Sequence, residues 1–117
     1  MARERGQGFP RQYRIVRGSD YRAVYAEGRK LLGDLFVLYF RENSLAHHRL
    51  GITVSRKIGG AVTRNRVKRL FREIFRRFCA DIPRHYDFVV NAKHGAARAG
   101  YHRLCSEFMS VVCRKCR

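Results

Sequence analysis

Apolar residues recur at helical spacing in the middle of the chain, and basic residues occupy most of the positions between them. Relative to the first, the apolar positions lie at offsets of 3, 4, 7, 8 and 11, which puts them on one face of an α-helix over residues 63–78. The six are Val67, Leu70, Phe71, Ile74, Phe75 and Phe78. Such a helix must bury its apolar face, so it is predicted to dock on a folded core.

The other side of this helix is crowded with cations. Residues 56–77 contain nine Lys or Arg and one acid, Glu73, which gives the segment a net charge of +8. Four cations stand four residues apart and form one ridge, with Asn65 and Arg69 beside it: Arg64, Lys68, Arg72 and Arg76. A charge run is usually only a solvated surface. Here, however, like charges at this spacing repel one another, and the guanidinium fork matches phosphate oxygens. The helix is therefore predicted to bind nucleic-acid backbone.

The whole chain fits one small basic domain. It has 117 residues and a formal net charge of +17, and 45% of its residues are hydrophobic, which is enough for a small core. No apolar run approaches the roughly 20 residues that cross a bilayer, and the first residues lack the apolar stretch of a secretory signal. We expect one cytoplasmic domain over residues 1–117, flexible over residues 1–12, that binds a polyanion and no membrane.

Local patterns predict the remaining elements. Ser19 and Asp20 are good helix N-cap residues and Gly28 is a good stop, so a short helix is expected between them. Strands are expected over residues 35–40, 49–55 and 87–92, with a further short strand near 29–31 and a last helix over 96–113. The strand at 49–55 has small residues on one face, which leaves room for a ligand. This order fits an α+β domain, a two-layer sandwich of one sheet and its helices.

The acidic and thiol side chains form no catalytic or metal pattern that stands out. No nucleophile–base pair or pair of carboxylates is evident among the nine acids. Cys113 and Cys116, in a basic tail at residues 113–117, have the two-residue spacing of a zinc or redox pair, but one pair is a weak signal. Cys105 falls on the apolar face of the last helix. The role of these three cysteines stays open.

The middle of the chain resembles a known family. Residues 50–75 read LGITVSRKIGGAVTRNRVKRLFREIF, and this block resembles the signature of the bacterial ribonuclease P protein subunit. Within it, residues 64–66 look like the Arg-Asn-Arg motif of that family, followed by Lys68 and Arg69 as expected. Further positions similar to the family lie in the first helix: Asp20, Tyr21, Tyr25 and Gly28. The resemblance extends over residues 13–112.

This resemblance implies an activity and a fold. Family members assist a catalytic RNA, with bound Mg²⁺, in the endonucleolytic hydrolysis that removes the 5′ leader of precursor tRNA. The protein, expected to be monomeric outside the ribonucleoprotein, would bind that RNA and the single-stranded leader. The implied fold has αβββαβα order, a mostly antiparallel sheet and a left-handed βαβ crossover, as in the second domain of a small-subunit ribosomal protein. Such a crossover breaks the usual right-handed rule, and no periodicity could reveal it.

Site residues follow from the resemblance, position by position. Six polar residues of the basic helix would contact or organise the catalytic RNA: Arg64, Asn65, Arg66, Lys68, Arg69 and Arg72. Three tyrosines would line a cleft between the first helix and the open sheet face and stack on leader bases: Tyr21, Tyr25 and Tyr39. Arg56 and Lys57 would hold leader phosphates. Core packing is the alternative role for Tyr21 and Tyr25, where phenylalanine is common in the family.

A structural RNA-binding protein without a role in cleavage, such as a ribosomal component, is the main alternative function. Basicity alone does not separate the two functions, and the fold can be shared. The Arg-Asn-Arg block and the tyrosines of the first helix favour the ribonuclease P subunit. The scarcity of acids agrees with an RNA catalyst, beside which the protein neutralises charge and positions the substrate.

Overall fold

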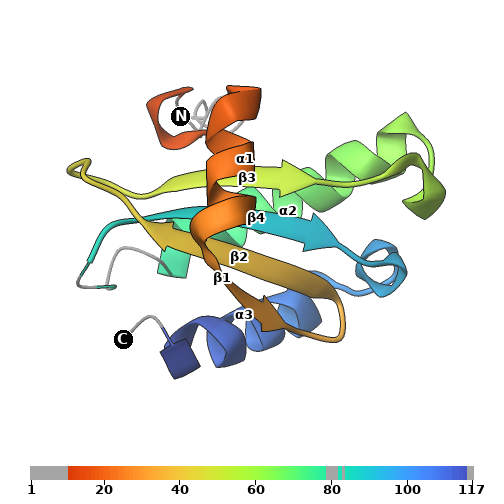
Figure 1. The fold of residues 1–117 in the computed structure, drawn as a ribbon. Helices are drawn as coiled ribbons and strands as arrows, with labels where there is room; N and C mark the ends of the chain where they lie inside the picture. Colours follow the sequence, from red (N-terminus) through yellow and green to blue (C-terminus); the bar gives the residue numbers. More distant parts are fainter. Residues whose placement is uncertain (1–10, 79–81, 83, 116–117) are drawn as a thin grey trace, which may run out of the picture.

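In the part of the chain that the structure describes, three α-helices surround one sheet (Figure 1). The computed structural model describes residues 11–78, 82 and 84–115. The main elements are α1 (Gly18–Glu27), β1 (Arg29–Leu32), β2 (Phe36–Glu42), β3 (Arg49–Thr53), α2 (Ala61–Phe78), β4 (Tyr86–Ala92) and α3 (Tyr101–Lys115). Short 3₁₀ turns precede the three helices: η2 (Arg11–Tyr13), η3 (Arg56–Ile58) and η4 (His94–Ala97). The predicted αβββαβα order, with its short first strand, is confirmed.

The four strands lie in the order β1-β2-β4-β3. β2 pairs antiparallel with β1 and β4, whereas β3 pairs parallel with β4, to which α2 connects it. In Figure 1 the arrows of β3 and β4 point the same way, β3 lies above β4, and α2 passes behind the sheet. This path makes the crossover left-handed. The mostly antiparallel sheet and the exception to the right-handed rule are therefore both present, as the resemblance implied.

α2 and α3 cover one face of the sheet and enclose the main core. Alternate residues of β2 point toward them, so Phe36, Leu38 and Phe40 are buried. The rings of Phe36 and Phe71, the latter from α2, pack edge to face with their centroids 5.4 Å apart. Phe108 of α3 is buried in the same core. This packing buries the apolar face of α2 and leaves its cationic side outside, as the periodicity predicts.

α1 crosses the other face of the sheet and covers only part of it (Figure 1). Val24 of α1 is buried with Ile15 and Val89 in a small second cluster, and Tyr21 and Tyr39 pack at its border. α1 thus adds a partial third layer to the predicted two-layer domain.

The predicted N-cap of α1 is wrong. The helix begins at Gly18, so Arg17 takes the N-cap position, and no side chain caps the helix there. The carboxylate of Asp20 instead bonds to Arg49 on β3, an interaction that a local pattern cannot show. The predicted stop at Gly28 is confirmed: a Cβ at this position would stand 2.5 Å from the carbonyl oxygen of Val24.

Several other boundaries differ from the prediction by one to five residues. The last helix begins at Tyr101 rather than at residue 96, because η4 and Gly100, a poor helix former, interrupt the predicted run. β2 continues to Glu42 rather than ending at residue 40, because its last residues pair with the start of β4. Within the described residues, no helix is long and apolar enough to cross a membrane.

Candidate nucleic-acid interface

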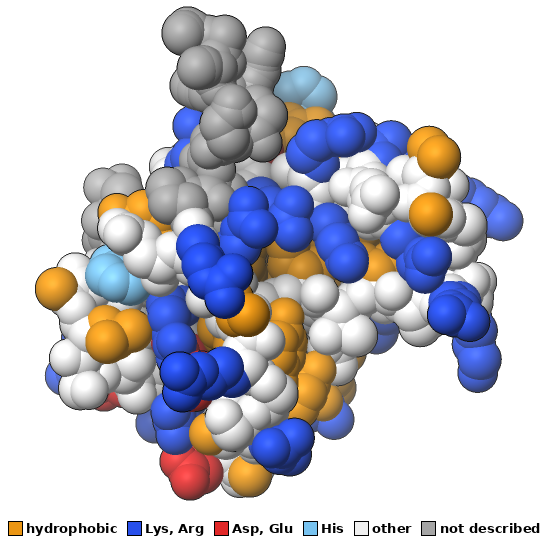
Figure 2. Space-filling model, turned by 90° about the horizontal axis from the view of Figure 1, so that it is seen from above, with side chains coloured by type: hydrophobic (Ala, Val, Ile, Leu, Met, Phe, Trp, Pro, Cys, Tyr) orange, Lys and Arg blue, Asp and Glu red, His pale blue; other side chains and the backbone are white. Residues whose placement is uncertain are grey.

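α2 carries its predicted site residues on the side turned away from the core. Val67, Phe71 and Ile74 are fully buried and anchor the helix, so the polar residues between them face outward. Asn65 and Arg69 are exposed; four other site residues of the helix are half-buried, namely Arg64, Arg66, Lys68 and Arg72. Figure 2, which looks down on the molecule from the side of β3, shows Lys and Arg side chains crossing this surface as a band.

Among the residues that the structure describes, the ion pairs of α2 lie at its C-terminal end. Arg76 pairs with Glu73, and Arg77 Nη1 lies 3.9 Å from the second oxygen of the same carboxylate. Within the described residues, the side chains of three cations of the N-terminal half form no ion pair or hydrogen bond: Arg64, Lys68 and Arg69. The Nε of Arg64 is even buried without a partner. This half of the ridge can therefore pair with an external anion without breaking a contact of the fold.

Arg66 differs from its neighbours because it makes a contact within the fold. Its Nη2 donates a hydrogen bond to the carbonyl oxygen of Ala97 in η4. This bond ties α2 to the segment that follows β4. A guanidinium has five N–H donors, so most of those of Arg66 are left for a phosphate.

Arg56 and Lys57 are exposed in η3, which follows β3. η3 packs beside the start of α2 and beside η4. The structure therefore groups these two cations with the N-terminal end of α2.

Tyr25 and Tyr39 form an aromatic surface on the α1 side of the sheet. Their rings meet edge to face with centroids 4.8 Å apart, and Tyr25 is 38% exposed. The Tyr25 hydroxyl donates to Asn91 Oδ1 over 2.8 Å, and Lys30 Nζ lies 5.8 Å from the centre of the Tyr39 ring. Aromatic faces bordered by an amide and an ammonium suit a nucleobase and its phosphate. The structure thus brings these two predicted tyrosines together on an accessible surface.

Tyr21 fills the space that the small face of β3 was expected to leave open. A Cβ on Gly51 would stand 2.7 Å from the Tyr21 ring, so the ring lies directly on the glycine. Burial raises the pKa of Tyr21, while the backbone of Ile52 and the charge of Arg72 act in the opposite direction. The prediction of a ligand-accessible surface at Gly51 is therefore wrong. This contact with Gly51 favours the core-packing role, which was the alternative for Tyr21.

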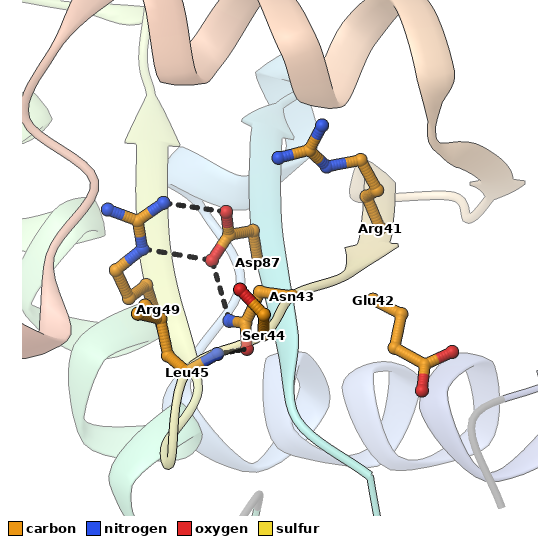
Figure 3. A pocket seen from close by; sticks show the side chains of 7 residues that line it. All are labelled: Arg41, Glu42, Asn43, Ser44, Leu45, Arg49 and Asp87. Atoms are coloured by element: carbon orange, nitrogen blue, oxygen red, sulfur yellow. Dashed lines mark hydrogen bonds and ion pairs between the residues drawn. The ribbon is translucent and has the colours of Figure 1, made fainter.

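Sequence reasoning missed a buried ion network beside the start of α1 (Figure 3). Asp87 of β4 is 0% exposed, and its oxygens accept hydrogen bonds from Arg49 Nε at 2.9 Å and Nη2 at 2.7 Å. Asn43 Nδ2 donates to the same carboxylate at 2.8 Å, and Arg49 Nη1 reaches Asp20 of α1 at 3.4 Å. The network borders a cavity of about 470 Å³. It links α1, β3 and β4, so it fixes α1 across the sheet.

Asp87 and Arg49 each stabilise the ionised form of the other. Burial alone would raise the pKa of Asp87, but the hydrogen bonds from Arg49 and Asn43 outweigh it, so the pKa lies below its usual value. The hydrogen bond to Asp87 in turn raises the pKa of Arg49. An acid inside an otherwise apolar strand, Asp87 in residues 86–90, is the sequence signal that could have pointed to such a network.

Metal and thiol sites can be assessed only in the described part of the chain. Among those residues, no group of three or more His, Cys, Asp or Glu side chains could hold a metal ion. Cys105 is a half-buried free thiol in α3. Cys116 and the side chains of Cys113 and Phe78 lie outside what the structure describes.

Comparisons with known proteins agree on one family. The family model described as Ribonuclease P matches residues 9–116. The ribonuclease P protein component of Streptococcus pneumoniae (strain Hungary19A-6) is 35% identical over 102 residues, which are 87% of this chain and 83% of that protein. Among solved structures, the RNase P protein of Staphylococcus aureus has a TM-score of 0.81 and 33% identity, covering 89% of this chain and 96% of that one. The RNase P protein from Thermotoga maritima has a TM-score of 0.78 and 34% identity, covering 86% and 96%.

Proposed function

The chain belongs to the ribonuclease P protein family and is thus a component of a tRNA-processing endoribonuclease, in which we propose that it is the RNA-binding subunit beside a catalytic RNA. The observation that supports this role most is the N-terminal half of α2. Its cations pair with no carboxylate in the described part of the chain, and they are fixed on a helix whose opposite face is packed into the core. Such a surface binds phosphates without rearranging the fold.

In this proposal, α2 contacts and organises the catalytic RNA. The residues that do so are Arg64, Asn65, Arg66, Lys68, Arg69 and Arg72. Successive ridge residues are four apart, which is about 6 Å along the helix axis, so they can follow a strand of backbone. Arg66 has a double role, since it also holds η4 through the carbonyl oxygen of Ala97.

In this proposal, the leader of precursor tRNA binds the aromatic surface on the α1 side of the sheet. Tyr25 and Tyr39 stack on its bases, because an aromatic face accepts any base and the leader varies in sequence. Tyr21 supports this surface from β3, where its ring packs on Gly51. Arg56 and Lys57 hold leader phosphates where the leader passes the end of β3.

The chemistry itself belongs to the RNA subunit in this proposal. Mg²⁺ is held mainly by that RNA, whose phosphate oxygens are the hard ligands that Mg²⁺ prefers. The protein neutralises charge, positions the leader and stabilises the RNA. It is monomeric outside the ribonucleoprotein and acts in the cytoplasm.

Replacing the exposed tyrosine tests the leader surface. Tyr25→Ala is expected to lower the affinity of the holoenzyme for leader-bearing precursor tRNA roughly tenfold, since stacking contributes about 1–3 kcal/mol per base. Affinity for mature tRNA, which has no leader, should stay nearly unchanged. The measurement is equilibrium binding of both ligands to holoenzyme assembled with saturating protein.

Tyr25→Phe is the matched control, because it keeps the aromatic face and removes only the hydrogen bond to Asn91. It should retain most of the leader-dependent affinity. Equal losses for precursor and mature tRNA in Tyr25→Ala would argue against a leader surface at this position.

A further inference from the structure

The hydrogen bond between Tyr25 and Asn91 lies where the covered part of the sheet meets the open part. In β4, Val89 is fully buried against Val24 of α1, whereas Asn91, two residues further on, is only half-buried. Two residues of a strand span about 7 Å, so the cover that α1 provides ends between these two positions. Figure 1 shows the sheet continuing beyond α1 toward the ends of β3 and β4.

The register of the sheet places four side chains next to one another in this open part. Residues that pair directly across neighbouring strands share one face of the sheet. Across β1, β2, β4 and β3 these partners are Leu32, Val37, Asn91 and Thr53, and we call them the open row. Thr53 is exposed and Leu32 is 65% exposed, so α1 covers neither end of the row. The open row adjoins the aromatic surface, because Val37 and Tyr39 are two residues apart on β2.

The bond from Tyr25 determines which end of the Asn91 amide is left for a ligand. Asn91 Oδ1 accepts the hydrogen bond from the Tyr25 hydroxyl over 2.8 Å. The amide nitrogen Nδ2 carries two N–H donors, and it makes no hydrogen bond to any residue that the structure describes. The fold therefore uses the acceptor end of this amide and leaves its donor end free to bind a nucleobase.

Cations border the open row at the ends of β4 and β3. Beyond Asn91, Lys93 Nζ donates to the Gly33 carbonyl oxygen over 2.7 Å, and two further donors of this ammonium are left for a phosphate. Beyond β3, the exposed side chains of Arg56 and Lys57 follow in η3. A polyanion with unpaired bases fits this arrangement, since its phosphates bind the cations while its bases lie on the sheet.

We propose that Asn91 is a specificity-determining residue for the leader, whose Nδ2 donates a hydrogen bond to an acceptor atom on the edge of one leader base. This inference rests on the proposed function, in which the leader binds the aromatic surface beside the open row. Stacking on Tyr25 and Tyr39 accepts any base, whereas the Asn91 donor is satisfied only by a base that places an acceptor opposite it. The leader is thus bound without selection where it stacks and with selection at one neighbouring position.

The test is a base scan of the leader. Precursor tRNAs that carry each of the four bases at each leader position near the cleavage site are bound to holoenzyme assembled with saturating protein. At one position the wild type is expected to bind the best base roughly fivefold more tightly than the worst, which is the effect of about one hydrogen bond. Asn91→Leu, which keeps the size of the side chain and removes the amide, should reduce this ratio to less than about twofold.

Two further variants change the polarity of the site rather than its shape. Asn91→Asp can still accept the Tyr25 hydroxyl but cannot donate, so it should disfavour the base that the wild type prefers and favour a base that presents a donor. Tyr25→Phe removes the bond that orients the amide and should also lower the wild-type ratio. The control Gln12→Leu removes an exposed amide from η2, outside the leader surface, and should leave the ratio near wild type.

The outcomes separate this inference from the proposed function. A base preference that Asn91→Leu removes and Asn91→Asp reverses supports the reading of a base by Asn91. A wild type that binds precursor more tightly than mature tRNA, but equally tightly with every leader base, overturns the inference and leaves leader binding in place. A base preference that persists in Asn91→Leu also overturns the inference. Equal binding of precursor and mature tRNA by the wild type would overturn the inference together with the proposed leader surface.

Discussion

Removing the unpaired cations of α2 is expected to weaken assembly with the catalytic RNA by roughly 100-fold or more. The variant is Arg64→Gln/Lys68→Gln/Arg69→Gln, which keeps good helix formers on the solvent side and leaves the buried face of α2 intact. Each of these side chains lacks a partner in the described fold, so its whole charge is free to bind phosphate. Titration of labelled RNA with protein at fixed salt measures the effect.

A matched triple variant distinguishes binding by these three side chains from an effect of the protein's net charge. Arg76→Gln/Arg77→Gln/Arg103→Gln also removes three positive charges, two of them from the same helix. Arg76 and Arg77 are paired with Glu73, so they contribute less to an external ligand. This control should lose less than about tenfold. Equal losses in the two triple variants would mean that net charge alone drives binding, and the assignment of RNA binding to the N-terminal half of the ridge would fail.

The second large effect is expected in the free energy of unfolding, when the buried network of Asp87 and Arg49 is broken. Asp87→Asn should lower the free energy of unfolding by about 3 kcal/mol at neutral pH, because it leaves Arg49 without its main partner. The exposed acid Asp34 provides the control, and Asp34→Asn should change stability by less than about 0.5 kcal/mol. Urea unfolding followed by circular dichroism measures both.

The same network predicts a pH dependence with a definite sign. The pKa of Asp87 in the folded protein lies below its usual 3.8, so the folded state favours the ionised carboxylate. The stabilisation is fully present above the unfolded pKa and is lost as the pH falls through the lower, folded pKa. The gap in stability between wild type and Asp87→Asn should therefore narrow between about pH 5 and pH 2. A gap that stays constant over this range would contradict the ionised Asp87–Arg49 pair.

Local patterns predicted the elements that bury one face and expose the other. The 3.6-residue period of Val67, Phe71 and Ile74 located α2 and its cationic side, because a helix that buries one stripe must expose the opposite one. Tyr39 lies on the α1 side of the sheet, whereas Phe36, Leu38 and Phe40 of the same strand point into the main core, as the two-residue period of a strand requires. The left-handed crossover, in contrast, followed only from the family resemblance, since periodicity carries no handedness.

Contacts between elements that are distant in the sequence could not be predicted from it. The ring of Tyr21 on Gly51, the bond from Arg66 to Ala97 and the network of Asp87 each join residues about 30 or more positions apart. A single sequence shows which residues are unusual, such as an acid in a strand, but not the partner that satisfies them. That pairing depends on the register of β3 and β4 and on the path of α1 across the sheet.

The most direct test is cleavage by the reconstituted ribonucleoprotein. A bacterial ribonuclease P RNA is incubated with precursor tRNA at low Mg²⁺, with and without this protein, and the 5′ cleavage product is quantified. We expect the protein to stimulate cleavage at the correct site and to cleave nothing without the RNA. Cleavage by the protein alone, or binding to a competent RNA without any stimulation, would contradict the proposed role, and the second result would favour a purely structural RNA-binding protein.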